Sequence, residues 1–205
     1  FTITNSGGYQ ASAIADGLGL AAPFQFSGGV FPGATGNCAA TLAAGASCTI
    51  EVSWVPGGVG LESDTVIINY DDGAAAQVMN HGIQGTGANP ALISITESNP
   101  YDYGSITENA TDNHIFTLNN GGGVPATSIL EIGLAAPYAY TGGAFPGTGG
   151  TCAVTLGVGA SCDIDIEFAP TSTGLLADTI SMQYNNGATV VTSDRQVQGT
   201  GLAAA

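Results

Sequence analysis

The 205-residue sequence contains no lysine and a single arginine, Arg195, against 16 aspartate and glutamate residues. Its formal net charge of −15 predicts repulsion from nucleic-acid phosphates and from anionic membrane surfaces. Without lysine, the chain cannot form the intramolecular Lys–Asn isopeptide bonds that cross-link some surface pilins. We therefore exclude nucleic acid as a partner and membrane insertion as a mode of attachment.

Long apolar runs and helical periodicity are also missing. No stretch reaches the ~18 apolar residues of a membrane-spanning helix, and no extended window shows the helical repeat of apolar residues. No signal peptide is visible, because Phe1 already lies within a strand-like pattern. Hydrophobic residues nevertheless make up 44% of the chain, enough to form cores. The sequence predicts an all-β protein.

An internal repeat is the strongest feature that the sequence does contain. Residues 20–60 and 134–174 align without a gap at an offset of 114 residues, and 21 of these 41 positions are identical. The same offset pairs Gly85-Thr86-Gly87 with Gly199-Thr200-Gly201. A fixed long period indicates one structural unit used serially. We predict two domains, 1–87 and 88–205, joined by a short turn-rich linker at 87–90.

The four cysteines form two pairs with identical spacing, Cys38/Cys48 and Cys152/Cys162. An even number of cysteines at repeated positions predicts one disulfide in each domain and an oxidising compartment. Buried free thiols are the alternative. A metal site is disfavoured because neither pair has a histidine or a third cysteine nearby.

Strands are indicated by apolar residues at every second position. From Cys48 to Trp54, and from Cys162 to Phe168, alternate residues are apolar, which predicts one half-buried strand per copy with Trp54 in the core. Each copy then shows a hairpin, over 65–82 and 179–197, with Asp-Gly or Asn-Gly at its turn. The other strands expected in the second copy are 91–96, 101–106, 114–119, 127–132 and 138–140. This spacing predicts two tandem immunoglobulin-like antiparallel β-sandwiches.

The first copy is incomplete. Residues 1–8 correspond to residues 116–123 after a one-residue shift, so the counterpart of 88–115 is missing. A sandwich without its first strands exposes a groove and an unpaired edge. Two explanations stay open: the chain is a piece of a longer array, or a strand from another subunit completes the domain, as in donor-strand pilins. The second explanation predicts head-to-tail polymerisation.

The ordered motifs L-I-S-I-T, Y-D-Y-G-S-I-T, F-T-L-N-N-G-G, C-x9-C with G-A-S before its second cysteine, I-x-F-x-P-T-x-x-G and Q-G-T-G resemble the abnormal-spindle/hydin-like (ASH) domain. Bacterial versions occur in secreted "choice-of-anchor D" repeat proteins. The resemblance covers 88–201 and most of 1–87, and the first copy departs from it at 54–57. It implies an immunoglobulin-like sandwich related to the major sperm protein fold, without catalytic residues, that serves as a spacer, adhesive unit or assembly unit.

Acidic residues are the main candidates for binding chemistry. Asp163, Asp165 and Glu167 alternate along one predicted strand and should share its outward face, with neighbours about 6.5–7 Å apart. They and the turn residues Asp71 and Asp72 are weak calcium candidates. A solvated acidic face and ordinary turn chemistry are the favoured interpretations, because calcium requires six to eight oxygen ligands.

Catalytic constellations are not indicated. His81 and His114 occupy different positions in the two copies, and neither lies in an H-E-x-x-H motif. Ser47 and Ser161 lie in G-A-S-C, which lacks the second glycine of a nucleophile elbow. We expect no catalytic residues, no cofactor and no enzymatic activity.

Together these features predict a non-catalytic structural repeat module of a secreted bacterial surface protein. It would form a stalk or a head-to-tail extracellular fibre, with a second copy or neighbouring repeats as partner. The alternative is an adhesin module that binds a glycan or a partner protein. Its candidate platforms are Tyr101, Tyr103, Tyr138 and Tyr140, although the spacing of the last two favours core packing. The sequence leaves open whether Asn109 is glycosylated.

Overall fold

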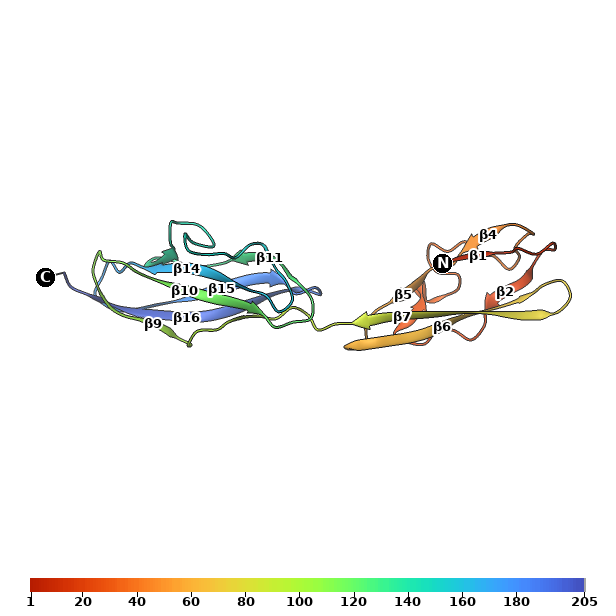
Figure 1. The fold of residues 1–205 in the computed structure, drawn as a ribbon, viewed down its shortest axis with the longest axis horizontal. Helices are drawn as coiled ribbons and strands as arrows, with labels where there is room; N and C mark the ends of the chain where they lie inside the picture. The colour runs from red at the N-terminus through yellow and green to blue at the C-terminus, as the bar shows by residue number, and fades with distance from the viewer. Residues whose placement is uncertain (205) are drawn as a thin grey trace. The chain divides into compact units, whose positions relative to one another are not determined.

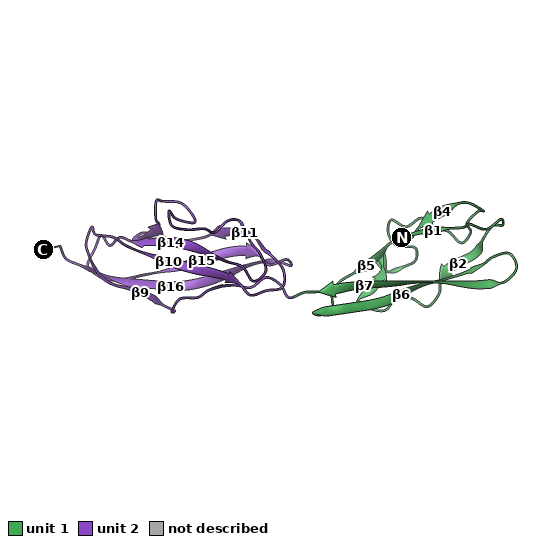
Figure 2. Ribbon diagram, in the orientation of Figure 1, with its two compact units in different colours: residues 1–88 green, residues 89–205 purple. Residues whose placement is uncertain are grey.

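The computed structural model describes residues 1–204, and its regular secondary structure consists of β-strands (Figure 1) apart from one single-turn 3-10 helix, η1 (Ser27–Gly29). The chain divides into two compact units, the first spanning Phe1–Ala88 and the second beginning at Asn89 (Figure 2). The predicted all-β class is confirmed. Each unit is described by itself below.

The second unit is a sandwich of two sheets. One sheet has the order β12 (Tyr138–Tyr140), β14 (Ser161–Phe168), β10 (Asp112–Asn120) and β8 (Ile93–Ile95). The other has the order β13 (Thr155–Leu156), β11 (Ala126–Glu131), β15 (Gly174–Asn185), β16 (Val190–Leu202) and β9 (Tyr101–Thr107). The chain thus passes from β8 in one sheet to β9 in the other, so its opening segment closes one edge of each sheet.

One strand pair departs from the expected antiparallel arrangement. β9 runs parallel to β16, with Tyr101 opposite Val197 and Ile106 opposite Gly201. The sequence pattern of β9 resembles that of any half-buried strand. Nothing in this segment indicates whether it runs parallel or antiparallel to its neighbour. The prediction of a wholly antiparallel sandwich is therefore wrong at this edge.

The core of the second unit lies between the two sheets. Strands β10, β14 and β15 supply seven of its apolar residues at 0% exposure: Phe116, Leu118, Ile164, Ile166, Phe168, Ile180 and Met182. They alternate along their strands because successive side chains point to opposite faces. The predicted inward face of the strand from Cys162 to Phe168 is confirmed.

The first unit contains counterparts of only some of these strands. β1 (Thr2–Thr4) pairs with β4 (Ser47–Thr49), and β3 (Phe24–Phe26) pairs with β5 (Val52–Trp54). The other layer is a three-stranded sheet of β2 (Ser12–Asp16), β6 (Gly60–Asp71) and β7 (Ala76–Gly87). The two layers again bury apolar side chains between them, including Ile14, Ile50, Val66 and Ile68.

The single strand predicted over 48–54 is interrupted between β4 and β5. Its counterpart β14 is continuous, and the first half of β10 pairs with it there, from Asp112 opposite Phe168 to Ile115 opposite Asp165. Residues 1–204 contain no counterpart of that half of β10 in the first unit. β5 therefore lacks a strand that could align it with β4.

Trp54 is half-buried and does not lie fully in the core, which corrects the expectation for this residue. The register of Trp54 is as predicted, because Trp54 and Phe168 pack against equivalent glycines. A Cβ atom added at Gly85 would come within 2.7 Å of the Trp54 ring, and one added at Gly199 would clash with the Phe168 ring. In the second unit Tyr103 also covers Phe168, with ring centroids 5.6 Å apart. Trp54 lacks such a cover because the first unit has no counterpart of β9 among the described residues.

Candidate binding groove of the first unit

An open groove with a volume of about 360 Å³ lies in the first unit, between β1 and the sheet that contains β6 and β7. Its apolar lining comes from both layers and includes Ile3, Ile14, Leu42, Ile68 and Met79. Tyr70 lies at its side, and residues 5–9 form its rim. The groove is thus an opening into the hydrophobic core of the unit.

The rim of the groove is shaped by the side chain of Asn5. Asn5 Nδ2 donates to the carbonyl oxygens of Tyr9, at 2.8 Å, and Leu42, at 2.9 Å. Asn5 Oδ1 accepts a 3.0 Å hydrogen bond from the Gly7 amide. An asparagine side chain that holds nearby backbone groups in this way fixes a turn.

Beside the groove, one edge of β1 is unpaired within residues 1–204. The Phe1 amino group donates to the Ile50 carbonyl at 2.8 Å, and the Asn5 amide donates to Ala46 at 2.9 Å. Amide direction alternates along a strand, so the amides of Thr2, Thr4 and Ser6 face the opposite, open side. Unpaired strand edges readily accept another strand.

The equivalent place in the second unit is filled by the segment around β8. Ala91, Ile93 and Ile95 point into the core with exposures of 4%, 3% and 2%. The Leu92 amide donates to Asn120 Oδ1 at 3.1 Å, and the Ile93 amide donates to the Tyr184 hydroxyl at 3.1 Å. This segment pairs antiparallel with β10.

The first unit retains the residues that hold this segment. Asn120 Nδ2 donates to Val124 and Leu156, as Asn5 does to Tyr9 and Leu42, which equates Asn5 with Asn120. Tyr70 and Tyr184 are related by the 114-residue offset. Asn120 and Tyr184 are buried, whereas Asn5 and Tyr70 are only half-buried. The sequence predicted a groove but did not identify these side chains, although the repeat contained the signal.

A second opening lies at the edge of β7. The equivalent strand β16 carries β9 along that edge, and Val197 beneath it has 0% exposure. Ile83, which corresponds to Val197, is only half-buried. Within the described part of the chain, the first unit is therefore open on one edge of each layer.

Charge at the groove is limited to its rim. Asp72 lines the groove, and the Ala75 and Ala74 amides together with the Gln77 side chain hold the pKa of its carboxyl below the usual value. His81 lies on β7 beside the opening and contacts the Phe1 ring edge-on, with ring centroids 5.4 Å apart. The groove interior is apolar, which suits an uncharged occupant.

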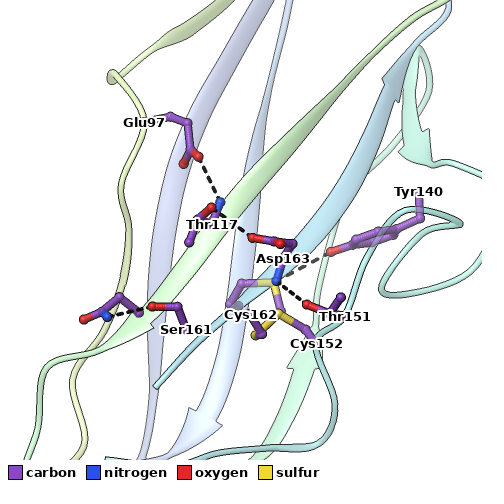
Figure 3. The surroundings of a disulfide bond; sticks show 10 residues. Glu97, Thr117, Tyr140, Thr151, Cys152, Ser161, Cys162 and Asp163 are labelled. Carbon is purple, nitrogen blue, oxygen red and sulfur yellow. Dashed lines mark hydrogen bonds between the residues drawn. A yellow bond between two sulfur atoms is a disulfide. The ribbon is translucent and has the colours of Figure 1, made fainter. Parts of the chain in front are cut away.

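The four cysteines form the disulfides Cys38–Cys48 and Cys152–Cys162, each within its own unit. Figure 3 shows the second, which ties β14 to the loop before it, with Asp163 beside it. Two such bonds indicate an oxidising, extracellular or periplasmic setting.

The acidic triplet on β14 does not form a common solvated face. Asp165 is buried at 4% exposure, because the loop over residues 141–150 folds across it. Its Oδ2 accepts from the Gly149 amide at 3.0 Å and its Oδ1 accepts from Asn113 at 3.2 Å. Asp163 accepts a 2.9 Å hydrogen bond from the Thr117 hydroxyl (Figure 3), and Glu167 is half-buried. The expectation of a solvated acidic face is wrong for Asp165, which lies on the outward side of β14 but is covered by this loop.

Glu51 is the equivalent of Asp165 in the first unit, and its carboxylate likewise accepts a hydrogen bond from a backbone amide. Glu51 Oε2 accepts a 2.9 Å hydrogen bond from the Thr35 amide, which is the main reason that the pKa of this carboxyl lies below its usual value. Asp71 and Asp72 accept hydrogen bonds from the amides of their own turn. Among residues 1–204, no three acidic, histidine or cysteine side chains are grouped as a metal site would require.

Three of the four tyrosines considered as binding platforms are buried. Tyr103, Tyr138 and Tyr140 have exposures of 6%, 1% and 7%. The hydroxyl groups of Tyr103 and Tyr138 donate to backbone carbonyls, at 2.9 and 3.0 Å, and burial raises the pKa of all three tyrosines well above the ordinary value. Only Tyr101 is half-buried, stacked on His114 at 4.0 Å. The platform interpretation is wrong for the three buried tyrosines.

The two serines of the G-A-S-C motifs pair with neighbouring polar side chains. Ser47 Oγ lies 2.8 Å from Thr4 Oγ1, and Ser161 Oγ accepts from Asn119 at 3.0 Å.

Within residues 1–204 there is no helix of the length and apolar character needed to cross a membrane.

No protein-family model and no curated protein matches this chain. Among solved structures, it is similar to a protein of unknown function from Porphyromonas gingivalis W83 (13% identity, 96% of this chain and 87% of that one, TM-score 0.40). It is also similar to the ASH/PapD-like domain 7 of human CEP192 (18%, 58% and 89%, TM-score 0.36). The VesB protease of Vibrio cholerae matches 55% of this chain over 32% of its own length (14%, TM-score 0.42). With TM-scores below 0.5, these likenesses assign neither a family nor a function.

Proposed function

We propose that this chain is a non-catalytic structural repeat module of a secreted bacterial surface protein. Its first unit would join the module to a neighbour, either a second copy or an adjacent repeat, which supplies the missing strand. Repetition of this contact would build a stalk or a head-to-tail fibre. The observation that carries the proposal is the open groove, whose equivalent in the second unit holds a strand.

A structural role is supported by the use of polar side chains. Asp163, Asp165 and Ser161, which could otherwise serve binding or catalysis, accept hydrogen bonds from groups of the same unit. Each unit contains one disulfide, which closes a short loop and stabilises that sandwich separately. Disulfide-bonded sandwiches with few charged residues, 8% of the chain, suit an exposed extracellular element.

Propagation is supported by the asymmetry between the units. The groove belongs to the first unit alone, so a partner strand that occupies it cannot at the same time offer the same surface in return. Such a contact is heterologous, and a heterologous contact that does not close into a ring continues indefinitely. The contact therefore builds a fibre or an array unless two copies exchange strands reciprocally, which would close a dimer.

The alternative of a glycan-binding adhesin is weakened by the tyrosines. A sugar platform needs accessible aromatic faces, and Tyr103, Tyr138 and Tyr140 are buried. If the chain is an adhesive module, its groove suits a protein partner better than a glycan.

Electron microscopy of the native protein tests the proposed function. We expect bead-strings or filaments with a regular axial repeat. Conditions that separate neighbouring filaments should leave the head-to-tail contacts within each filament intact. Isolated compact particles at all concentrations, together with specific binding on a glycan array, would favour the adhesin function instead. The same preparation should be assayed by non-reducing peptide mapping, because free thiols would contradict the extracytoplasmic setting.

A further inference from the structure

The second unit contains two Asn-Gly pairs, Asn120-Gly121 and Asn186-Gly187. In such a pair the backbone nitrogen of the glycine can attack the carbonyl carbon of the asparagine side chain. Glycine hinders this attack least, because it carries no Cβ and its backbone adopts many conformations. The two pairs have opposite surroundings, and the difference decides which of them can react.

Asn120 is held rigidly inside the second unit. Its side chain has 0% exposure, and Nδ2 donates to three backbone carbonyls. Oδ1 accepts from the Leu92 and Gly122 amides, at 3.1 and 3.0 Å. The Gly121 amide, which would be the attacking group, donates to the Leu92 carbonyl at 2.9 Å. Because both reacting groups are fixed and water is excluded, we expect Asn120 to be inert in the folded chain.

Asn186 lies at the tip of the hairpin between β15 and β16. It is half-buried, and the next two residues, Gly187 and Ala188, are exposed. The Gly187 amide donates to Asn185 Oδ1 at 2.8 Å. This acceptor belongs to a side chain and not to the backbone, so the hydrogen bond can open by rotation of Asn185 alone. The attacking nitrogen is therefore accessible, and so is the water that the later steps consume.

The side-chain carbonyl of Asn186 is polarised by the turn itself. Asn186 Oδ1 accepts from the Ala188 amide at 2.9 Å and from the Thr189 amide at 2.8 Å. Attack on Cγ places a negative charge on this oxygen. Backbone amides that already point at such an oxygen stabilise the charge as it develops. The hydrogen bonds that shape the turn thus also favour the reaction.

The equivalent turn of the first unit shows that the product fits. The repeat offset pairs Asn186 with Asp72, and a glycine follows in both turns. Asp72 Oδ1 accepts from the Ala74 and Ala75 amides, both at 2.8 Å. One turn therefore binds a carboxylate with the same pair of amides that binds a neutral amide oxygen in the other.

We propose that Asn186 is a site of spontaneous deamidation in the folded protein, restrained by the hydrogen bond from Gly187 to Asn185. The Gly187 nitrogen attacks Asn186 Cγ and gives its proton to water. A succinimide ring forms as the bond from Cγ to Nδ2 breaks, and the departing nitrogen takes up a proton and leaves as ammonia. Water then opens the ring. The reaction needs no other reagent and does not depend on what fills the groove of the first unit.

Ring opening gives two products with different main chains. Addition of water at Cγ yields aspartate, as in the first unit. Addition at the main-chain carbonyl carbon yields isoaspartate, whose main chain runs through Cβ and Cγ and is one carbon longer. Both products add one negative charge to the turn.

Peptide mapping of the full 205-residue chain tests the site. The folded chain is incubated in mildly alkaline heavy-oxygen water and then digested at low pH, where the reaction is slow. We expect heavy oxygen to enter at Asn186 at least about tenfold faster than at Asn120. In the urea-unfolded chain, Asn120 should react as well. Equal rates at the two sites of the folded chain would overturn the proposal, as would an unmodified Asn186 under conditions that modify the unfolded chain.

A pair of variants tests the restraint on the attacking nitrogen. Asn185→Ala should speed the reaction about 3–10-fold, because the Gly187 amide loses one hydrogen bond. Its matched control is Asn119→Ala, which changes the residue before the other Asn-Gly pair and should leave the rate at Asn186 unchanged. An unchanged or slower reaction in Asn185→Ala would contradict the restraint.

The two products are distinguished by the stability of the second unit. Asn186→Asp reproduces the aspartate product and should leave the unfolding temperature of this unit unchanged, since the first unit carries Asp72 in the same turn. The isoaspartate form, separated by ion-exchange chromatography, should unfold at a lower temperature because its turn is longer. A destabilised Asn186→Asp chain would contradict the equivalence of the two turns.

Discussion

Trp54 and Phe168 occupy the same position in the two repeats but have different surroundings. Phe168 has 0% exposure and contacts both Tyr103 and Tyr138. Trp54 stacks on Phe24 at 5.9 Å, donates through Nε1 to Glu62 at 2.8 Å, and is otherwise half-buried. The two positions thus differ in burial because Tyr103 covers Phe168, whereas among residues 1–204 no counterpart of Tyr103 covers Trp54.

This difference predicts unequal effects of truncation. Phe168→Ala should lower the free energy of unfolding of the second unit by about 3–5 kcal/mol, and Trp54→Ala should lower that of the first unit by only about 2 kcal/mol. Differential scanning calorimetry, with each transition assigned to its unit, checks both values. An equal or larger loss for Trp54→Ala would mean that Trp54 is covered in solution and that the open edge of β7 is occupied.

The buried tyrosines predict an alkaline limit to the stability of the second unit. Burial raises the pKa of Tyr103, Tyr138 and Tyr140 in the folded state above the unfolded value of about 10. Because the folded state favours the neutral form, their contribution is complete below pH ~10 and is lost progressively at higher pH. Absorbance at 295 nm should show these tyrosines ionising together with unfolding. Gradual ionisation of every tyrosine in a folded chain would contradict their burial.

At the scale of elements, the disulfides are local staples. Each joins cysteines only 10 residues apart within one unit. Replacing Cys38 and Cys48 together by alanine should lower the free energy of unfolding of the first unit by about 2–3 kcal/mol, since the unfolded chain gains freedom. The equivalent change at Cys152 and Cys162 should affect only the second unit. A change in both transitions from one double variant would show that the units do not unfold independently.

Strand positions and faces were largely predictable, because side chains alternate strictly along a strand. The inward residues from Cys162 to Phe168 and the two hairpins follow from this period. The break between β4 and β5 and the parallel direction of β9 were not, because each depends on a strand distant in sequence. Asp165 shows the same limit: alternation placed it outward correctly, but a loop folds over that face.

The groove was predictable in outline from the missing counterpart of 88–115 in the alignment. The role of Asn5 and Tyr70 in lining it was not, since they look like ordinary turn and strand residues until their equivalents, Asn120 and Tyr184, are seen to bind a segment. The burial of Tyr138 and Tyr140 agrees with their alternate spacing, which favours core packing, whereas nothing in the sequence showed that Tyr103 on β9 is covered.

At the scale of the whole molecule, two versions of one domain differ most in the strands at their sheet edges, because within residues 1–204 the first unit has no counterpart of β8 or β9. The second unit contains its closing segment, and the first unit keeps the contact residues for such a segment while its groove is open. Within residues 1–204, the chain therefore combines a sandwich whose groove is filled with one whose groove is open.

Amide hydrogen exchange of the native assembled protein, compared with the 205-residue chain alone, tests the central claim most directly. The account predicts that the Thr2, Thr4 and Ser6 amides exchange rapidly in the chain alone. In the assembly they should slow by about 100-fold or more, equivalent to ~3 kcal/mol of added local stability. Amides of the β15–β16 hairpin should exchange equally in both samples. Equal exchange at β1 in the two samples would contradict the claim that a strand completes the first unit.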